Sequence, residues 1–240
     1  MGFRREITGE ECDNRNMDYM NYSFLVFDWN GTLVNDCQLC FDLLNKMLKE
    51  RGHPTVSFET YRDIFTFPIL SYYKKAGFCF KPEGEDDFAL LASEFRADYE
   101  EAFPSLSLYP DALPFLEMAK ERLPLYLLSA TREDLLLKET KEKGIDGYFH
   151  ALIGIKDIYG ASKEAAGKAF FEKANLDPSK ALFIGDSLHD EEVAMSFGAD
   201  CVLIANGHQS KKVLSEGKKK KETNIFVSLE DFSAVLFAKK

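Results

Sequence analysis

The sequence lacks an excess of positive charge and any long apolar run. It carries 40 acidic residues against 30 basic ones, a net charge of -10, which argues against nucleic acid or an anionic membrane as the main partner. No stretch reaches the length of a transmembrane helix, and the N-terminus has no apolar signal-peptide core. We therefore expect a cytoplasmic protein that binds neither. The only strong basic run, Lys218–Lys221, is interpreted as a solvated loop.

Cysteines are few, and their spacing does not complete a metal site. The odd count of five is typical of a reducing compartment rather than of a disulfide framework. Cys37 and Cys40 form a C-x-x-C spacing, but no second cysteine or histidine pair completes a tetrahedral zinc set. We interpret both as positions on an amphipathic helix.

The chain is long enough for one large domain, or for a core with a smaller insert. It has 240 residues, of which 45% are hydrophobic, an ordinary composition for a globular protein. Residues 1–20 are polar and without period, so we predict a disordered tail. Residues 37–109 show successive apolar patterns at helical spacing, which predicts a helical cap. Residues 21–36 and 110–240 remain as the core.

The core segments alternate between apolar runs and amphipathic stretches. This pattern predicts an α/β fold, a doubly wound, Rossmann-like parallel sheet with helices on both faces. The predicted strands are Tyr22–Asp28, Leu125–Ser129, Ala151–Ile155, Ala181–Asp186, Cys201–Ala205 and Asn224–Ser228.

The first, second and fourth of these strands end in polar residues at positions where a ligand should bind. Asp28 ends the first and Ser129 the second, while Asp186 ends the fourth, with Asp190 four residues further on. The carboxyl ends of parallel strands share one edge, where open α/β sheets bind ligands. Buried carboxylates there need a cation to offset them, and two aspartates at one edge suit an oxygen-ligand site for Mg²⁺.

The order of these motifs resembles the haloacid dehalogenase superfamily of hydrolases. The chain carries FDWNGTL, then LLSAT, then a lysine, then IGDSLHD. The helical insert between the first two motifs resembles the class of that family with a helical cap. The likeness covers nearly the whole chain after residue 20. It implies a phosphatase similar to phosphoglycolate phosphatases, acting on a small phosphorylated metabolite.

The resemblance also implies a role for each motif residue. Asp28 would be the nucleophile that forms an aspartyl-phosphate. Its second oxygen, the backbone carbonyl of Asn30 and Asp186 would hold Mg²⁺, with Asp190 as a ligand or supporting the metal from outside. The phosphoryl group would be bound by Thr32, Ser129, the backbone amide of Ala130, and Lys163.

The identity of the motif lysine stays open between two positions. Lys163 follows Ser162 at a predicted helix start and is preferred, whereas Lys168 lies further into the helix, where a solvated charge is expected. Lys156 is a weaker third candidate.

Asn30 departs from the family's pattern. Phosphatases of this family usually carry an aspartate two residues after the nucleophile, where it acts as general acid and base. An amide cannot exchange a proton at neutral pH, and a positioned acid or base typically contributes about 10²–10⁴-fold. Three explanations remain: a leaving group that needs no proton, a replacement acid such as His189, Asp36 or a cap residue, or a phosphate-binding protein with little turnover.

Several alternatives follow from the cap. A phosphonate-cleaving enzyme would need a cap lysine as Schiff base, with Lys46, Lys74 and Lys75 as candidates. Arg62 or Arg132 could contact a second anionic group. The aromatic residues Phe65, Phe67, Tyr72 and Tyr73 lie in the segment expected to face the substrate, but they are interpreted mainly as the cap's own core. Protein partners and oligomeric state stay open.

Overall fold

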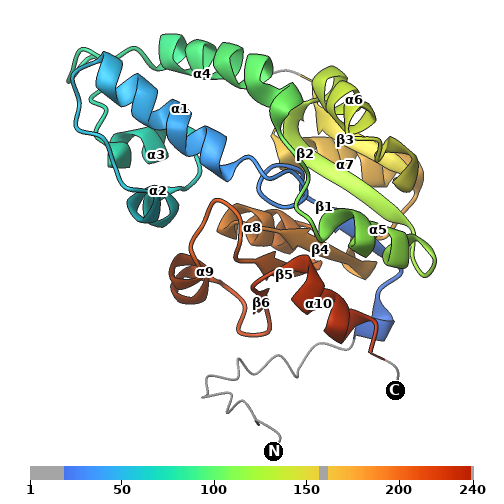
Figure 1. Cartoon of the computed structure of the whole chain (residues 1–240). Coiled ribbons are helices and arrows are strands. Elements are labelled where there is room, and N and C mark those ends of the chain that lie inside the picture. Colours follow the sequence, from blue (N-terminus) through green and yellow to red (C-terminus); the bar gives the residue numbers. More distant parts are fainter. Residues whose placement is uncertain (1–18, 157–161, 239–240) are drawn as a thin grey trace, which may run out of the picture.

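A computed structural model of the chain describes residues 19–156 and 162–238. Six parallel strands form one sheet in the order β3-β2-β1-β4-β5-β6 (Figure 1), which confirms the predicted doubly wound fold. The strands are β1 Phe24–Phe27, β2 Leu125–Arg132, β3 Ala151–Ile155, β4 Ala181–Gly185, β5 Asp200–Ile204 and β6 Asn224–Phe226.

Helices cover both faces of the sheet because strand side chains alternate between the faces. In β1, Leu25 and Phe27 belong to one buried cluster, while Phe24 and Val26 belong to the other. The first cluster includes residues of α5 (Ala112–Lys120), α6 (Glu133–Glu142) and α10 (Leu229–Leu236). The second includes residues of α7 (Lys163–Ala174), α8 (Leu188–Ser196) and α9 (Lys211–Gly217).

Strand β1 lies at the point where the strand order reverses. From β1 the chain builds β2 and β3 on one side and β4 to β6 on the other. Leu25 is paired with Leu125 of β2 and with Leu182 of β4. Such a reversal opens a crevice beyond the carboxyl ends of the strands, so the residues that follow β1 face a natural ligand site.

The segment between β1 and α5 is helical throughout its regular elements. Ser57 and Asp87 cap α2 and α4 through their side chains, and Gly77 ends α3 in the left-handed conformation. Figure 1 shows these helices grouped beside the sheet. They are α1 Cys37–Glu50, α2 Phe58–Ile64, α3 Ile69–Ala76, α4 Phe88–Ala102 and the short 3-10 helix η2 Phe103–Ser105.

Helices α8 and α9 differ from the sequence expectation. The residue pattern predicts a helix over Glu191–Phe197, but α8 begins three residues earlier, at Leu188. The reason is its cap: the backbone N–H and the hydroxyl of Ser187 both donate to Asp190, which fixes the first turn. Helix α9 was not predicted; it is short, and Ser210 caps it by accepting from the N–H of Val213.

The fold starts slightly before the predicted boundary at residue 21. Tyr19 begins the 3-10 helix η1 (Tyr19–Asn21), is buried, and packs edge-on against Phe232. Its hydroxyl accepts a hydrogen bond from the Asn224 side chain at 2.7 Å. Residues 1–18, the rest of the predicted tail, lie outside the described residues. Two more 3-10 turns are η3 Asp146–Tyr148 and η4 Pro178–Lys180.

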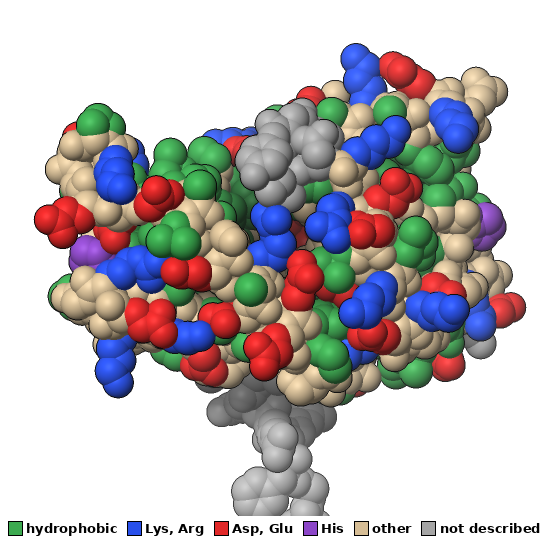
Figure 2. Space-filling view, turned by 90° about the horizontal axis from the view of Figure 1, so that it is seen from above, with side chains coloured by type: hydrophobic (Ala, Val, Ile, Leu, Met, Phe, Trp, Pro, Cys, Tyr) green, Lys and Arg blue, Asp and Glu red, His purple; other side chains and the backbone are tan. Residues whose placement is uncertain are grey.

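The surface agrees with the acidic, mixed composition. Among the described residues, no helix has the length and apolar character needed to cross a bilayer. Figure 2 shows basic and acidic side chains interspersed on the face it presents, without a large described patch of either sign.

Candidate active site

Asp28 follows the last residue of β1 and contacts a lysine brought in by another helix. Lys163 is the first residue of α7, whose start is fixed by the Ser162 cap. Its Nζ lies 2.6 Å from Asp28 Oδ1 and also contacts Asp190 Oδ1. Lys168 and Lys156 are exposed. The geometry therefore favours Lys163 over both alternatives.

Three carboxylates share this lysine. Oxygen atoms of Asp28, Asp186 and Asp190 all lie within 4.8 Å of one another. Burial, opposed by Lys163 and reinforced by Asp190, raises the pKa of Asp28 to about 6. Burial raises the pKa of Asp186 to about 7; the neighbouring carboxylates add to the rise, while His208 opposes it. We call Asp28, Lys163, Asp186 and Asp190 the Asp28 cluster. One lysine does not neutralise three carboxylates, so a further cation would offset the remaining negative charge of this cluster.

Asp186 lies against the backbone of two loops. The N–H of His208 donates to its Oδ2 at 2.5 Å, and the hydroxyl of Thr32 lies 3.5 Å from its Oδ1. A Cβ at Gly31 or Gly207 would overlap this carboxylate, and Gly31 also has a positive φ of 71°. Glycine is therefore required at Gly31 by both its backbone and its neighbour.

Asp190 has both oxygens occupied by protein donors. Oδ1 accepts from Lys163, and Oδ2 accepts from the N–H and hydroxyl of Ser187 at 3.1 and 2.7 Å. The sequence left two roles open for Asp190, a direct metal ligand or a supporting group. Its hydrogen bonds fit the supporting role better, because they orient Lys163 and the start of α8.

Ser129 and Ala130 line a small pocket that also contains Asp28 and Lys163. Ser129 is buried at the end of the regular part of β2, and its hydroxyl accepts from the N–H of Thr131 at 3.0 Å. The pocket has a volume of about 80 Å³. Its wall includes Asp28, Asn30, Ser129, Ala130, Lys163, Asp186, Asp190 and, from the helical segment, Phe65 and Phe67.

The Asn30 amide is fully engaged by its neighbours. Its Nδ2 donates to Asp36 Oδ2 at 2.9 Å and to the Tyr99 hydroxyl at 2.7 Å, while its Oδ1 accepts from the Thr131 hydroxyl at 3.1 Å. An aspartate at this position would place a second carboxylate against Asp36. The amide is therefore complementary to its surroundings, beyond lacking an exchangeable proton.

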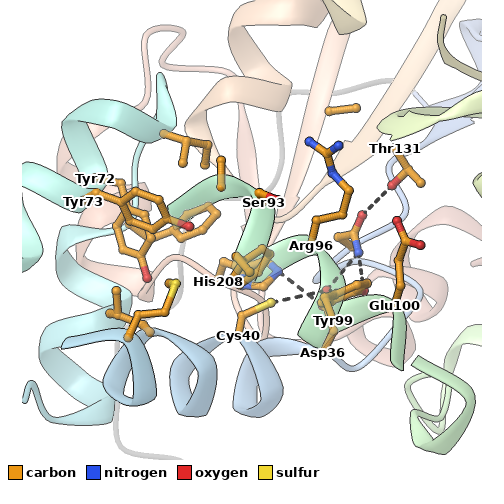
Figure 3. Close-up of a pocket in the computed structure, with 18 of the residues that line it drawn as sticks. Asp36, Cys40, Tyr72, Tyr73, Ser93, Arg96, Tyr99, Glu100, Thr131 and His208 are labelled. Carbon is orange, nitrogen blue, oxygen red and sulfur yellow. Dashed lines mark hydrogen bonds and ion pairs between the residues drawn. The ribbon is translucent and has the colours of Figure 1, made fainter. Parts of the chain in front are cut away.

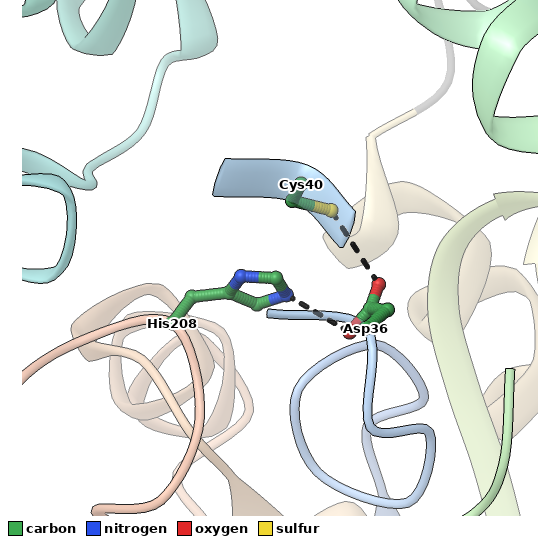
Figure 4. Close-up of side chains that lie close together, drawn as sticks. All are labelled: Asp36, Cys40 and His208. Atoms are coloured by element: carbon green, nitrogen blue, oxygen red, sulfur yellow. Dashed lines mark hydrogen bonds and ion pairs between the residues drawn. The ribbon is translucent and has the colours of Figure 1, made fainter. Parts of the chain in front are cut away.

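Asp36 is the centre of this second network, which sequence reasoning proposed only as a replacement acid. It accepts from the N–H of Gly31 at 2.9 Å and from the Tyr99 hydroxyl at 2.9 Å, and its Oδ1 lies 3.2 Å from His208 Nε2 (Figure 4). We call Asn30, Asp36, Tyr61, Tyr99 and His208 the Asp36 cluster.

Charge pairing stabilises the Asp36 cluster. Burial would raise the pKa of Asp36, but His208, Asn30 and Tyr99 outweigh it and lower the value. Burial would lower the pKa of His208, but Cys37, Tyr61 and Asp36 outweigh it and hold it well above the usual value. We therefore treat the two as an imidazolium–carboxylate pair. The other ring nitrogen of His208 lies 2.6 Å from the Tyr61 hydroxyl, so neither nitrogen is free for a substrate.

Cys40 lies beside this pair, as Figure 4 shows, and the three residues resemble a metal-ligand group. Its Sγ lies 3.8 Å from Asp36 Oδ2, and burial raises the pKa of its thiol well above the usual value. Both Asp36 oxygens already accept hydrogen bonds from other donors. A metal would have to displace these donors, so the geometry favours a hydrogen-bonded core cluster.

The arginine and cap-lysine candidates do not line the pocket around Asp28, whereas His189, a candidate replacement acid, does. Arg62 donates to the backbone carbonyls of residues 205, 207 and 209, and Arg132 pairs with Asp134. Lys46 pairs with Asp98 at 2.7 Å. Lys74 and Lys75 are exposed. Among the described residues, Lys163 is the only lysine in the wall of the small pocket that contains Asp28.

Sequence reasoning missed His208, Tyr99 and Tyr61. His208 follows β5 at the same edge of the sheet as Asp28 and Asp186, and this position after a strand is the signal that could have identified it. Tyr61 and Tyr99 come from α2 and α4, and nothing in their local sequence distinguishes them from other helical aromatics.

Comparisons with known proteins agree with this geometry. A family model of haloacid dehalogenase-like hydrolases matches residues 25–204. A phosphoglycolate phosphatase from Pseudomonas fluorescens is 26% identical over 198 residues, which cover 80% of this chain and 72% of that protein. A pyrophosphatase from Listeria monocytogenes is 24% identical over 174 residues, covering 70% and 76%.

A solved structure shows the same fold. A haloacid dehalogenase-like family protein from Streptococcus pneumoniae superposes with a TM-score of 0.73 at 20% identity, covering 90% of this chain and 99% of that one. The family model spans most of the described chain and includes all four motifs that led to the resemblance in sequence, with Lys163 as the motif lysine. The chain therefore belongs to the haloacid dehalogenase-like hydrolase family.

Proposed function

We propose that this protein is a Mg²⁺-dependent phosphohydrolase that works through an aspartyl-phosphate on Asp28. The observation that carries the proposal is the position of Asp28 at the carboxyl end of the central strand, 2.6 Å from Lys163 and beside Asp186. The phosphatase and pyrophosphatase relatives support the same reaction class.

The donor set of the Asp28 cluster fits Mg²⁺. All its candidate ligand atoms are oxygens, which hard divalent cations prefer, and three carboxylates face a single lysine. Asp28, Asp186 and the backbone carbonyl of Asn30 would hold the ion, while Asp190 orients Lys163 from behind. When bound, Mg²⁺ supplies charge neutralisation for the phosphoryl oxygens.

The remaining residues bind and position the phosphoryl group. A carboxylate oxygen of Asp28 attacks phosphorus, forming an oxygen–phosphorus bond as the bond to the leaving group breaks and its electron pair departs with that group. Lys163, the hydroxyls of Ser129 and Thr32, and the amide of Ala130 hold the phosphoryl oxygens. Water then attacks phosphorus, and the bond between phosphorus and the Asp28 oxygen breaks with its electron pair returning to the carboxylate. The two protons of the water leave with the inorganic phosphate, which restores Asp28.

Asn30 restricts the kinds of leaving group that the site can serve. Its amide cannot donate a proton to a departing oxygen, and its three hydrogen bonds hold it in the wall between Asp36, Tyr99 and Thr131. Leaving groups that depart without protonation suit such a site: an acyl phosphate, an aryl phosphate or an anhydride. The pyrophosphatase relative acts on an anhydride by its name.

The helical segment 37–109 would serve as the cap over this site. Phe65 and Phe67 from this segment line the catalytic pocket, and a closed cap excludes water from the reacting groups. The phosphonate-cleaving alternative is disfavoured, because the described pocket walls contain no cap lysine. The alternative hypothesis is a phosphate-binding protein without turnover.

A substrate screen tests the proposal. Acetyl phosphate, p-nitrophenyl phosphate, pyrophosphate and phosphoglycolate would each be assayed with Mg²⁺ and with EDTA. We expect Mg²⁺-dependent release of phosphate, fastest from substrates with good leaving groups, and its loss in Asp28→Asn. If no substrate is hydrolysed but phosphate still binds, the result would instead support a phosphate-binding protein without turnover.

A further inference from the structure

A second and much larger cavity adjoins the catalytic pocket. Its volume is about 790 Å³, against about 80 Å³ for the pocket that contains Asp28. Asn30, Phe65, Phe67, Ala130 and His208 line both spaces. A phosphoryl group at Asp28 would therefore have its leaving group directed toward this cavity. Its size lies within the range of sites for drug-sized ligands, roughly 300–1,000 Å³.

The wall of the large cavity is mostly apolar and rich in aromatic rings. Tyr72 and Tyr73 from α3 lie on one side (Figure 3), and Phe88 and Phe95 from α4 also line it. Phe65 completes a ring cluster with Tyr72, their centroids 5.1 Å apart. As the sequence predicts, Tyr72 and Tyr73 belong to a buried core cluster, with Phe65 packed against it. The same three residues also line a space large enough for a ligand.

One part of the cavity wall, formed by α2 and Phe65, is hydrogen-bonded to the core. Arg62 of α2 donates to three carbonyls of the loop after β5. In return, Gln209 of that loop donates to the carbonyl of Phe65 at 2.7 Å, and Ser210 donates to Asp63. These contacts hold α2 and Phe65 at a defined distance from the sheet edge.

The cavity offers little to a small, doubly charged acid. Arg132 pairs with Asp134, and His208 pairs with Asp36. Arg96 is half-buried in the wall and has no ion pair or hydrogen bond with any described residue. A second anionic group would thus find one unpaired guanidinium, while most of the surrounding wall stays apolar. The organic part of phosphoglycolate, a two-carbon acid, would leave most of this space unfilled.

We propose, on the basis of the phosphohydrolase function above, that the substrate is a phosphate compound with a bulky, mainly apolar organic part. That part fills the cavity between α3 and α4, against Tyr72, Tyr73, Phe88 and Phe95. Apolar burial there favours such a substrate over a short, charged one. Size and apolarity of the leaving group thus add to the requirement set by Asn30.

Binding of two phosphonates tests this without relying on turnover. Naphthylmethylphosphonate and methylphosphonate share a phosphoryl group that is not hydrolysed but differ in apolar bulk. With Mg²⁺ present, calorimetry should show at least about tenfold tighter binding of the naphthyl compound, because burial of a ring-sized apolar surface typically gives that much.

Two substitutions on the same helix make a matched pair. Ala92 lines the cavity and Ala97 is exposed on α4. Ala92→Phe should fill part of the space and remove most of the naphthyl preference, while Ala97→Phe should keep it. Thermal unfolding of both variants shows that each is folded.

The outcomes separate this inference from the proposed function. Equal affinity for the two phosphonates, no binding of either, or an Ala92→Phe variant with an unchanged preference overturns the bulky-substrate inference, even if acetyl phosphate is hydrolysed through Asp28. Naphthyl-selective binding that Ala92→Phe abolishes supports it, even if no substrate turns over, and then only the hydrolase proposal fails.

Discussion

Two buried polar clusters lie side by side beyond the end of β1, and they differ in how far their negative charges are compensated by neighbouring cations. In the Asp36 cluster, both carboxylate oxygens, the Asn30 amide and both ring nitrogens of His208 have partners. In the Asp28 cluster, three carboxylates share one lysine.

The difference indicates which cluster binds ligands. Buried polar groups with all their hydrogen bonds satisfied rigidify a structure, so the Asp36 cluster fixes the loop that follows Asp28. Uncompensated buried charge is costly until a cation or ligand arrives. The same few residues after one strand therefore supply both the reacting group and its support.

The largest expected effects come from replacing the central carboxylates of the two clusters, Asp28 and Asp36. Asp28→Asn should lower turnover by at least about 10⁴-fold, as loss of a nucleophile does, without lowering stability, because Lys163 keeps its contact with Asp190. Asp36→Asn should instead lower stability by about 3–5 kcal/mol, because it leaves the His208 cation unpaired.

Denaturant unfolding and phosphate release on the same samples would check this contrast. If Asp36→Asn were as stable as the wild type and as inactive as Asp28→Asn, the division into a reacting and a supporting cluster would be wrong.

A medium effect concerns the amide at position 30. Asn30→Asp alone should cost about 1–3 kcal/mol of stability, because a donor becomes an acceptor facing Asp36 and Tyr99. The exchange Asn30→Asp with Asp36→Asn restores one donor between the two positions. We expect it to be more stable than Asp36→Asn alone, because one carboxylate stays in the cluster, and to raise turnover of phosphoglycolate by about 10²-fold, the usual contribution of a positioned acid.

The control for this exchange is a substrate whose leaving group departs without protonation by an acid. p-Nitrophenyl phosphate, with a good leaving group, should respond much less to the exchange. A single Asn30→Asp variant with wild-type stability would show that the amide is not required by its neighbours.

The smallest effect concerns Glu139, which lies next to the Asp36 cluster. Trp29 Nε1 donates to its Oε2 at 2.7 Å, whereas Oε1 is buried and has no hydrogen-bond partner. Burial, opposed by Trp29 and reinforced by Asp36, Glu100 and Glu142, raises the pKa of Glu139 to about 7.

A raised carboxyl pKa means that the folded state prefers the protonated form. Stability from this group is therefore present below pH 4.5 and is lost as the pH rises through about 7. Glu139→Gln should raise stability at pH 8 by about 1–3 kcal/mol and change it little at pH 4.5. Urea unfolding at the two pH values measures this, and an equal gain at both would contradict the shifted pKa.

Much of the fold was predictable from residue pattern. The residue pattern predicts strands at 125–129 and 151–155 and a helix over Lys163–Ala174. The structure has each within a few residues of these bounds, because continuous apolar runs and capping residues are local signals. The early start of α8 was missed, since it depends on the Ser187–Asp190 cap. The short helix α9 has too few turns to show a period.

The sequence by itself determined the sheet, the edge at which Asp28, Ser129 and Asp186 meet, and the absence of the usual acid at Asn30. These follow from local patterns and from the rule that parallel strands end on one side. Tertiary structure alone decided that Lys163 contacts Asp28, that Asp36, Tyr99 and His208 hold the amide, and that a large aromatic cavity lies beside the pocket. Such contacts join residues far apart in the chain, and no local period or cap records which distant side chains will meet.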